Sequence, residues 1–252
     1  MMSDNKIFLL HIPKTAGTAL SRAFRGAVPL ERYFEHMESR VPLFGEVVVD
    51  GGPFFVSGHF TYEIAQTLIA REDVFSLTVL RDPVRQLESH IKWLKAYGNP
   101  ADPERLAQIP PPIAELALQL WESDLNCVSD LEKVLERPLG YQLFDNLQVR
   151  YLTSAKVSKI TSAEAELACE NITSFSFYFV MEDLPAAMER LQVRFPGVCE
   201  LERVNSSMID ESIVPENNKV MDYLLEKTKF DQVLFDRARE SSRRSFLAHR
   251  SK

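Results

Sequence analysis

Four stretches of the chain are apolar over most of their length: Ile7–Ile12, Phe54–Ser57, Phe75–Leu80 and Phe175–Met181. The alternation of polar and apolar residues that is typical of a strand with one face in water is missing from them. Strands of this kind are buried on both faces, which is the usual situation in a parallel sheet. We therefore expect four buried strands.

A helical pattern follows each of these apolar stretches. The predicted helices are Thr18–Phe24, Tyr62–Ala70, Pro83–Tyr97 and Pro185–Phe195. Strands that alternate with helices along a chain form a parallel sheet with helices packed on it. The fold class that we predict is therefore α/β, with a central parallel sheet flanked by helices.

Two regions depart from this alternation. Gly98–Arg137 begins with proline-rich turns and continues with two helical stretches, and it predicts a helical insertion, a candidate lid over a bound acceptor. The tail Glu216–Lys252 is charged and amphipathic, and we expect it to pack on the sheet, with a coiled-coil partner face as the alternative. Its apolar positions at near-helical spacing are Val220, Leu224, Leu225, Val233, Leu234 and Phe235. Neither an internal repeat nor a linker is apparent, so we predict one domain over residues 1–252.

The composition is that of a globular protein, because 45% of the 252 residues are hydrophobic and 26% are charged. The net charge of -7 argues against general binding to nucleic acid or to an anionic membrane, although it permits a local basic pocket. The three cysteines, Cys127, Cys169 and Cys199, are odd in number and widely spaced. They indicate neither a disulfide framework nor a zinc site, and we expect buried, reduced thiols.

The turn after the first predicted strand has the residues of an anion site. Backbone N–H groups at the start of a helix are free to bind an anion at the carboxyl end of the preceding strand. Lys14 adds a positive charge, Gly17 allows close approach to the backbone, and Thr15 and Thr18 supply hydroxyls. The alternative is an ordinary capped turn with an exposed lysine.

The turn differs from the phosphate loop of nucleotide triphosphatases. Their motif, G-x-x-x-x-G-K-[ST], places the lysine after a long glycine-rich loop, whereas Lys14 precedes the only glycine of this turn, Gly17. The shorter loop predicts a smaller anion than a triphosphate chain. One feature keeps a nucleotide kinase or triphosphatase as an alternative: Val47–Asp50 resembles the apolar run and aspartate that hold magnesium in those enzymes.

A second anion-binding element is predicted after the strand Phe75–Leu80. Asp82 is placed to cap the next helix, and Pro83 suits the first position of that helix. Arg81 and Ser89 can then meet on one anion at the end of the strand. The alternative is an arginine paired with a nearby carboxylate.

These two elements together resemble a known family. The stretch His11–Thr18 (HIPKTAGT) is similar to the H-I-P-K-T-G-G-T signature of sulfotransferases that use 3′-phosphoadenylyl sulfate (PAPS), especially the carbohydrate branch with the heparan sulfate 2-O- and 6-O-sulfotransferases. The stretch Arg81–Ser89 resembles the R-D-P-x-x-R-x-x-S element of the same family, in which the middle arginine falls on Gln86 here. The resemblance covers roughly residues 7–207 and is strongest before Trp93.

The resemblance implies a nucleotide-kinase-like (P-loop-like) three-layer fold and a set of cofactor contacts. Residues 14–18 (Lys14, Thr15, Ala16, Gly17 and Thr18) would bind the 5′-phosphosulfate, and Arg81 and Ser89 would bind the 3′-phosphate. Ala16 replaces the usual glycine, which is tolerated where φ is negative. The product would be adenosine 3′,5′-bisphosphate (PAP). The family's basic loop over the adenine falls near Val204–Ser207, where only Arg203 is basic.

His59 is the candidate base. It follows the strand Phe54–Ser57 in a G-H-x-x-Y stretch, like the histidine that acts as the base in heparan sulfate 2-O-type sulfotransferases. A histidine at the carboxyl end of a parallel strand lies beside the crevice where such sheets bind ligands. The alternative for His59 is a hydrogen-bonded core histidine, and Glu63 is the reserve base. His90 is expected to be structural, and His36 and His249 lie outside any motif.

Asn146, Gln148 and Arg150 resemble the family's N-x-Q-x-R-x-L segment near the cofactor and acceptor cleft. We expect no metal, since no His/Asp/Glu cluster is apparent from the sequence. The insertion 98–137 is acidic, which favours a neutral or lightly charged acceptor, a carbohydrate or small metabolite, over a highly sulfated polymer. The oligomeric state is not predicted.

The sequence thus predicts a PAPS-dependent sulfotransferase, with a non-catalytic nucleotide- or glycan-binding relative as a further alternative. The apolar run before His11 is too short for a signal sequence or a membrane span, and no other run approaches ~18 apolar residues. We therefore expect a cytoplasmic protein. A protein of the Golgi lumen is the alternative if an anchor segment has been removed from the chain.

Overall fold

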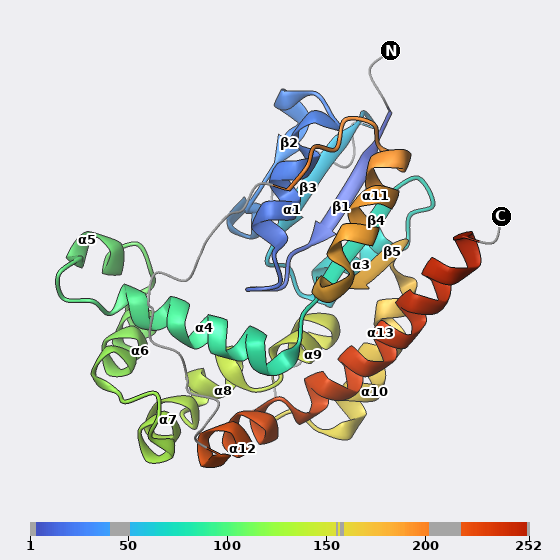
Figure 1. The fold of residues 1–252 in the computed structure, drawn as a ribbon. Helices are drawn as coiled ribbons and strands as arrows, with labels where there is room; N and C mark the ends of the chain where they lie inside the picture. Colours follow the sequence, from blue (N-terminus) through green and yellow to red (C-terminus); the bar gives the residue numbers. More distant parts are fainter. Residues whose placement is uncertain (1–3, 41–50, 155, 157–158, 202–217, 251–252) are drawn as a thin grey trace.

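The centre of the structure, a computed structural model, is a sheet of five parallel strands among the described residues, which are 4–40, 51–154, 156, 159–201 and 218–250 (Figure 1). The order across the sheet is β2-β3-β1-β4-β5. The strands are β1 (Lys6–Leu10), β2 (Tyr33–Phe34), β3 (Phe54–Gly58), β4 (Phe75–Leu80) and β5 (Phe177–Val180). The predicted α/β class, with a parallel sheet flanked by helices, is confirmed.

The register brings the ends of the central strands to one edge of the sheet. Leu10 of β1 is paired with Gly58 of β3 on one side and with Thr78 of β4 on the other. Phe34 of β2 is paired with Val56 of β3. Because all strands are parallel, the loops that follow them leave from this same carboxyl edge.

Helices cover both faces of the sheet. One face carries α1 (Gly17–Ala23) and α11 (Leu184–Arg194). The other carries α3 (Tyr62–Ile69), α9 (Leu147–Thr153), α10 (Ser162–Asn171) and α13 (Lys229–Arg250). Successive side chains of β1 point to opposite faces of the sheet: Leu9 packs in the core on the α1 side, whereas Leu10 packs in the core on the α3 side.

A third apolar core lies outside the sheet. Figure 1 shows its helices grouped to one side of the strands, with α4 as a long helix that runs along the group. They are α4 (Pro83–Tyr97), α5 (Pro103–Leu106), α6 (Pro111–Glu122), α7 (Val128–Leu135), α8 (Pro138–Phe144) and α12 (Asn218–Lys227). Short 3-10 segments complete the described chain at Phe24–Gly26, Leu30–Arg32, Met37–Arg40, Ile172–Ser174 and Met181–Asp183. The helical character predicted for residues 98–137 is confirmed.

The start of α4 follows its sequence signals. The side chain of Asp82 accepts a hydrogen bond from the backbone N–H of Arg85 at 2.9 Å, and Pro83 occupies the first turn. Both features were predicted, because an aspartate cap and a proline that needs no N–H partner are local preferences of a helix start.

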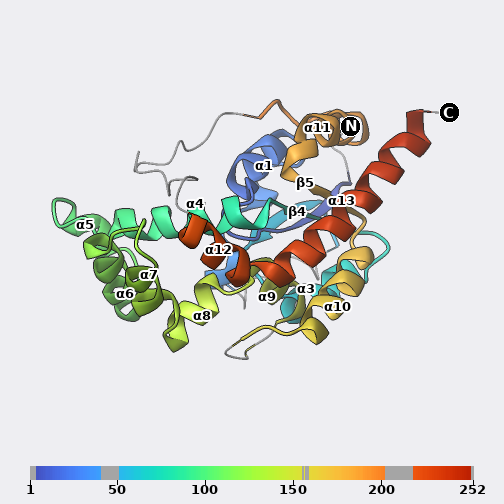
Figure 2. The ribbon, with the colours of Figure 1, turned by 60° about the horizontal axis from the view of Figure 1, so that its bottom comes forward.

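The predicted amphipathic tail divides into two helices with different partners (Figure 2). In α13, Leu234 and Phe235 pack into the core on one face of the sheet, as expected. In α12, Val220 and Leu224 join the helical core instead. Leu225 and Val233 are exposed to solvent and belong to neither core.

Some expectations are wrong or fall outside the described residues. All three cysteines are free, but only Cys169 is buried, while Cys199 is exposed. The segments Val47–Asp50 and Arg203–Ser207 lie outside the described residues. Within the part of the chain that the structure describes, no helix combines the length and the apolar content needed to cross a membrane.

Candidate functional site

The loop between β1 and α1 has an unusual backbone. Lys14 and Ala16 both adopt left-handed conformations, with φ of 67° and 70°. The condition under which an alanine replaces this glycine without cost, a negative φ, is therefore not met, and Ala16 carries steric strain that a glycine avoids. Gly17 is needed for a different reason: a Cβ atom there would lie 1.8 Å from the ring of His11.

Three consecutive carbonyl groups of this loop are held by side chains. The Thr15 hydroxyl donates to the carbonyl of residue 12 at 2.9 Å, and the Gln86 amide donates to that of residue 13 at 2.9 Å. The Arg81 guanidinium donates to the carbonyl of Lys14 at 3.0 Å. The strained backbone is therefore fixed by contacts from its own turn, from β4 and from α4.

Four consecutive backbone N–H groups where this loop enters α1 have no hydrogen-bond partner among the described residues. Within the described residues, the N–H groups of Thr15, Ala16, Gly17 and Thr18 form no hydrogen bond. A left-handed residue followed by a helical one directs successive N–H groups toward one point, which is a common arrangement for binding an anion. This loop, residues 12–18, can therefore hold a phosphate-sized anion through its backbone, and we call it the anion loop.

Positive side chains reinforce this preference for an anion. Burial lowers the pKa of Lys14, and the nearby charges of Arg81 and Arg105 lower it further. The Lys14 ammonium lies 5.9 Å from the centre of the Trp93 ring. No carboxylate forms an ion pair with Lys14 or Arg81 in the part of the chain that is described, so an anionic ligand would relieve the repulsion between them.

Arg81 is held in place by Gln148. The Gln148 side chain accepts a hydrogen bond from the Arg81 N–H at 3.0 Å and donates one to the Arg81 carbonyl at 2.9 Å. Gln148 is fully buried, so the pair of bonds is shielded from water. The structure thus gives Gln148 the role of positioning Arg81, and a contact of Gln148 with the acceptor stays a prediction.

Ser89 lies on the side of α4 that faces this loop. It is three residues after Gln86 and four before Trp93, both of which contact residues 13–14, and such spacings share one helix face. Ser89 is partly buried, and its hydroxyl has no partner among the described residues. The structure therefore brings Ser89 to the same region as Lys14 and Arg81.

His59 lies beside the anion loop and has a defined tautomer. Its Nδ1 is 2.6 Å from the backbone carbonyl of His11, which can only accept, so Nδ1 carries the proton. Burial lowers the pKa of His59, and the ring is neutral at pH 7. Its Nε2 therefore has a free lone pair that can take a proton.

Other histidines surround His59. The His11 and His59 ring centres are 4.4 Å apart, and burial holds the pKa of His11 far below its usual range. Burial lowers the pKa of His90 to about 3, with further effects from Lys14 and His59. His90 packs between Trp93 and Phe144, in keeping with a structural role.

The expectation that no His/Asp/Glu cluster is present is wrong. His36, Glu38 and His59 each direct one possible ligand atom to a common place, with all three atoms within 4.8 Å of one another. The cluster forms because β2 lies beside β3, so that the residues after Phe34 reach the same edge as His59. The two-residue strand β2 is too short to be recognised from a hydrophobic pattern, so the proximity of these three residues could not be predicted from the sequence.

Glu63 is in the first turn of α3 and is exposed. Its backbone N–H binds the Ser154 hydroxyl at 2.7 Å. Among the described residues its carboxylate contacts none of Lys14, His59 and Arg81. The geometry therefore favours His59 over Glu63 as the group beside the anion loop.

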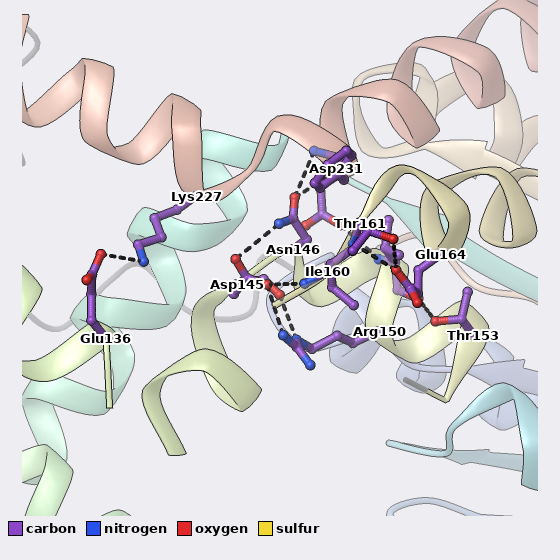
Figure 3. A network of polar contacts seen from close by, with 12 residues as sticks. Glu136, Asp145, Asn146, Arg150, Thr153, Ile160, Thr161, Glu164, Lys227 and Asp231 are labelled. Atoms are coloured by element: carbon purple, nitrogen blue, oxygen red, sulfur yellow. Dashed lines mark hydrogen bonds and ion pairs between the residues drawn. The ribbon is translucent and has the colours of Figure 1, made fainter. Parts of the chain in front are cut away.

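Asn146 and Arg150 take part in a buried network that joins two helix starts (Figure 3). The Asn146 side-chain oxygen accepts from the N–H groups of Phe230 and Asp231, at 2.8 and 3.0 Å, in the first turn of α13. In return, the Asp231 carboxylate accepts from the N–H groups of Gln148 and Val149, at 3.2 and 2.8 Å, in the first turn of α9. Each helix thus caps the other.

The same network contains a buried ion pair. Arg150 lies 2.9 Å from the carboxylate of Asp145, which also accepts the N–H of Ile160 at 3.0 Å. Asn146 is therefore occupied in holding α9 to α13, and Arg150 in binding Asp145 just before α9. Contact of either residue with an acceptor stays a prediction.

Several residues of the site were missed from the sequence. His11, His36, Glu38, Gln86, Trp93 and Arg105 all lie at or near the anion loop or His59. Arg105 comes from the helical insertion, which therefore contributes charge to the site. The only sequence signal for Arg105 is a basic residue within a helical pattern, and such residues are common on any surface helix.

The backbone strain at position 16 predicts the effect of Ala16→Gly. A left-handed alanine costs about 1–2 kcal/mol, and the extra freedom of glycine in the unfolded chain offsets about 0.5–1 kcal/mol of this, so the variant should be more stable by up to about 1.5 kcal/mol. Urea unfolding measures the change. The matched control is Ala70→Gly, at an exposed position with φ of -74°, which should be slightly destabilising. A loss of stability in Ala16→Gly as large as in the control would contradict the strain.

Asp231 should make the stability depend on pH. Burial raises the pKa of Asp231 to about 7, although its two backbone donors lower it. Between about pH 4 and pH 7 the folded chain then holds a proton that the unfolded chain has released, so stability falls as the pH rises through this range and is level above it. The free energy of unfolding of the wild type, relative to Asp231→Asn, should fall by about 1 kcal/mol or more from pH 4.5 to pH 8, measured by urea unfolding.

The control for this comparison is Asp236→Asn, an exposed position of the same helix. It should keep the pH dependence of the wild type. An equal pH dependence in Asp231→Asn and the wild type would show that Asp231 does not hold the proton.

Comparison of the chain with models of known protein families gave no match, and comparison with curated protein sequences gave none either. A functional assignment therefore depends on the residues of the site itself.

Proposed function

We propose that this chain is a sulfotransferase that moves a sulfuryl group from PAPS to a hydroxyl of an acceptor. The observation that carries the proposal is the meeting of two features at one edge of the sheet: the loop of free N–H groups with Lys14 and Arg81, and the unprotonated Nε2 of His59. The loop and its positive side chains can bind a phosphosulfate, and the Nε2 of His59 can accept the proton of an acceptor hydroxyl. The resemblance of residues 11–18 and 81–89 to the PAPS-dependent family supports the same reading.

The reaction is an in-line displacement at sulfur, analogous to phosphoryl transfer. The acceptor oxygen forms a bond to sulfur, and its proton passes to Nε2 of His59. The bond from sulfur to the 5′-phosphate oxygen breaks, and the electron pair stays on the departing PAP. Lys14 and the N–H groups of residues 15–18 stabilise the charge that grows on this oxygen.

The other end of the nucleotide is assigned to Arg81 and Ser89. Gln148 fixes the backbone of Arg81, and the hydroxyl of Ser89 is free to bind an oxygen of the 3′-phosphate. Both residues lie at the end of β4 or on the helix that follows it, next to the loop after β1. A nucleotide with a phosphate at each end can therefore span neighbouring strands. A P-loop-like, nucleotide-kinase-like three-layer fold is part of the proposal.

A nucleotide triphosphatase is less well supported. In those enzymes the hydroxyl residue after the loop lysine binds magnesium. Thr15 holds that place here, but it is buried, and its hydroxyl donates to a carbonyl of its own loop. The acceptor is proposed to be a carbohydrate or a small metabolite, approached from the side of the helical insertion.

Nucleotide binding tests the donor assignment. Calorimetric titration should give a clear heat of binding with PAP and none with ATP and magnesium. Arg81→Ala and Lys14→Ala should each weaken PAP binding about tenfold or more, because each removes a charge-assisted contact to a phosphate. The matched control Arg85→Ala, an exposed arginine on α4, should bind PAP like the wild type. Binding of ATP with magnesium in place of PAP would overturn the sulfotransferase assignment.

Turnover tests the base. With PAPS labelled in the sulfuryl group and a panel of sugars and small alcohols, His59→Ala should lower the rate of transfer by about 10²-fold, because general-base help is lost. Lys14→Ala should lower it by about 10²-fold as well, through the leaving oxygen. Glu63→Gln should keep the wild-type rate. Loss of turnover in Glu63→Gln but not in His59→Ala would move the role of base to Glu63, and transfer to no acceptor would favour the non-catalytic alternative.

A further inference from the structure

Three side chains at the carboxyl edge of the sheet have the chemistry of a metal site. His36, Glu38 and His59 place one ligand atom each within 4.8 Å of the others. His36 Nδ1 is 3.4 Å from Glu38 Oε1. Ligands around a tetrahedral zinc ion, with bonds of about 2.0–2.2 Å, stand about 3.3–3.5 Å apart. One pair thus already has this spacing, and only a small closure would bring in the third.

We propose that His36, Glu38 and His59 form a binding site for one divalent transition-metal ion, with zinc as the best fit. Two imidazoles and one carboxylate are a donor set that zinc prefers, whereas magnesium and calcium require mostly oxygen ligands. Three protein ligands leave the fourth tetrahedral position open to water or to a ligand atom.

The hydrogen bonds around the three side chains already orient them for a metal. Histidine ligands usually donate their second ring N–H to a carbonyl or carboxylate, which fixes the ring. His59 does so through Nδ1 to the carbonyl of His11 at 2.6 Å, leaving Nε2 for the ion. The second carboxylate oxygen of Glu38 accepts the backbone N–H of His59 at 3.1 Å.

The backbone also makes room for the cluster. A Cβ atom on Gly58 would lie 2.5 Å from Glu38 Oε2, so a glycine at this position lets Glu38 approach His59. His36 has a left-handed backbone, with φ of 53°, so the chain leaves the extended path of β2 at this residue. The side chain of His36 is 58% exposed, so an ion can enter from solvent.

A metal ion bound at this site would affect the proposed reaction. Only this effect rests on the proposed function; the metal site itself does not. The lone pair of His59 Nε2 that would take the acceptor proton is the same one that would bind the ion. Zinc would therefore inhibit sulfuryl transfer reversibly, and removal of the ion by a chelator would restore it.

Metal binding can be measured without any activity. The chain is first freed of metal with a chelator and then titrated with Zn²⁺ against a colorimetric chelating indicator. The wild type should bind one ion per chain, and Co²⁺ should give the visible absorption bands of a tetrahedral nitrogen- and oxygen-ligated ion. His36→Ala, an exposed position, and Glu38→Gln should each weaken Zn²⁺ binding at least tenfold. The control His249→Ala removes a histidine outside the cluster and should bind like the wild type.

Two results would overturn the site: Zn²⁺ binding in His36→Ala as tight as in the wild type, or no measurable Zn²⁺ binding by the wild type. Thermal unfolding of each variant establishes that it is folded. In the transfer assay, Zn²⁺ should inhibit the wild type and should inhibit His36→Ala at least tenfold less strongly. A chain that transfers no sulfate would count against the proposed function, whereas the titration would still decide the metal site.

Discussion

Parallel strands end at a common edge, and in this chain that edge holds the side chains of the candidate site. The pairing of Leu10 with Gly58 and with Thr78 sets the loops after β1, β3 and β4 next to one another. The positions of the anion loop, His59 and Arg81 follow from this register, because the loop follows β1 and His59 and Arg81 are the first residues after β3 and β4. A slip of one strand by a single residue would separate these groups and turn its apolar side chains to the opposite face.

The site is built at a cost in stability that the surrounding structure offsets. Lys14 and Arg81 are partly buried positive charges, and Lys14 and Ala16 have strained backbones. Such features persist only where other contacts determine the conformation. Here the loop carbonyls are held by Thr15, Gln86 and Arg81, so the protein itself fixes the conformation of the loop. Binding of an anion would then need little rearrangement, which is an advantage for stabilising charge during a reaction.

The end of the chain supports this site from a distance. Asp231 at the start of α13 caps α9, and Asn146 at the start of α9 caps α13. Gln148 of α9 in turn binds both backbone polar groups of Arg81, whose guanidinium holds the carbonyl of Lys14. A loss of the α9–α13 contact would therefore weaken the anion loop as well as the core.

The sequence by itself determined the features that depend on neighbours along the chain. The four long strands, the helices after them, the Asp82–Pro83 helix start and the residues of the anion loop follow from local hydrophobic pattern, capping preference and motif spacing. Only the tertiary structure decided the rest. The short strand β2 exists because β3 offers it a partner, and this pairing brings His36 and Glu38 to His59. The positive φ of Ala16, the tautomer of His59 and the reciprocal caps at Asn146 and Asp231 likewise arise from groups that lie far apart in the sequence. Local preference cannot reveal them, since each is set by a hydrogen bond or a contact that exists only once the sheet and its helices have assembled.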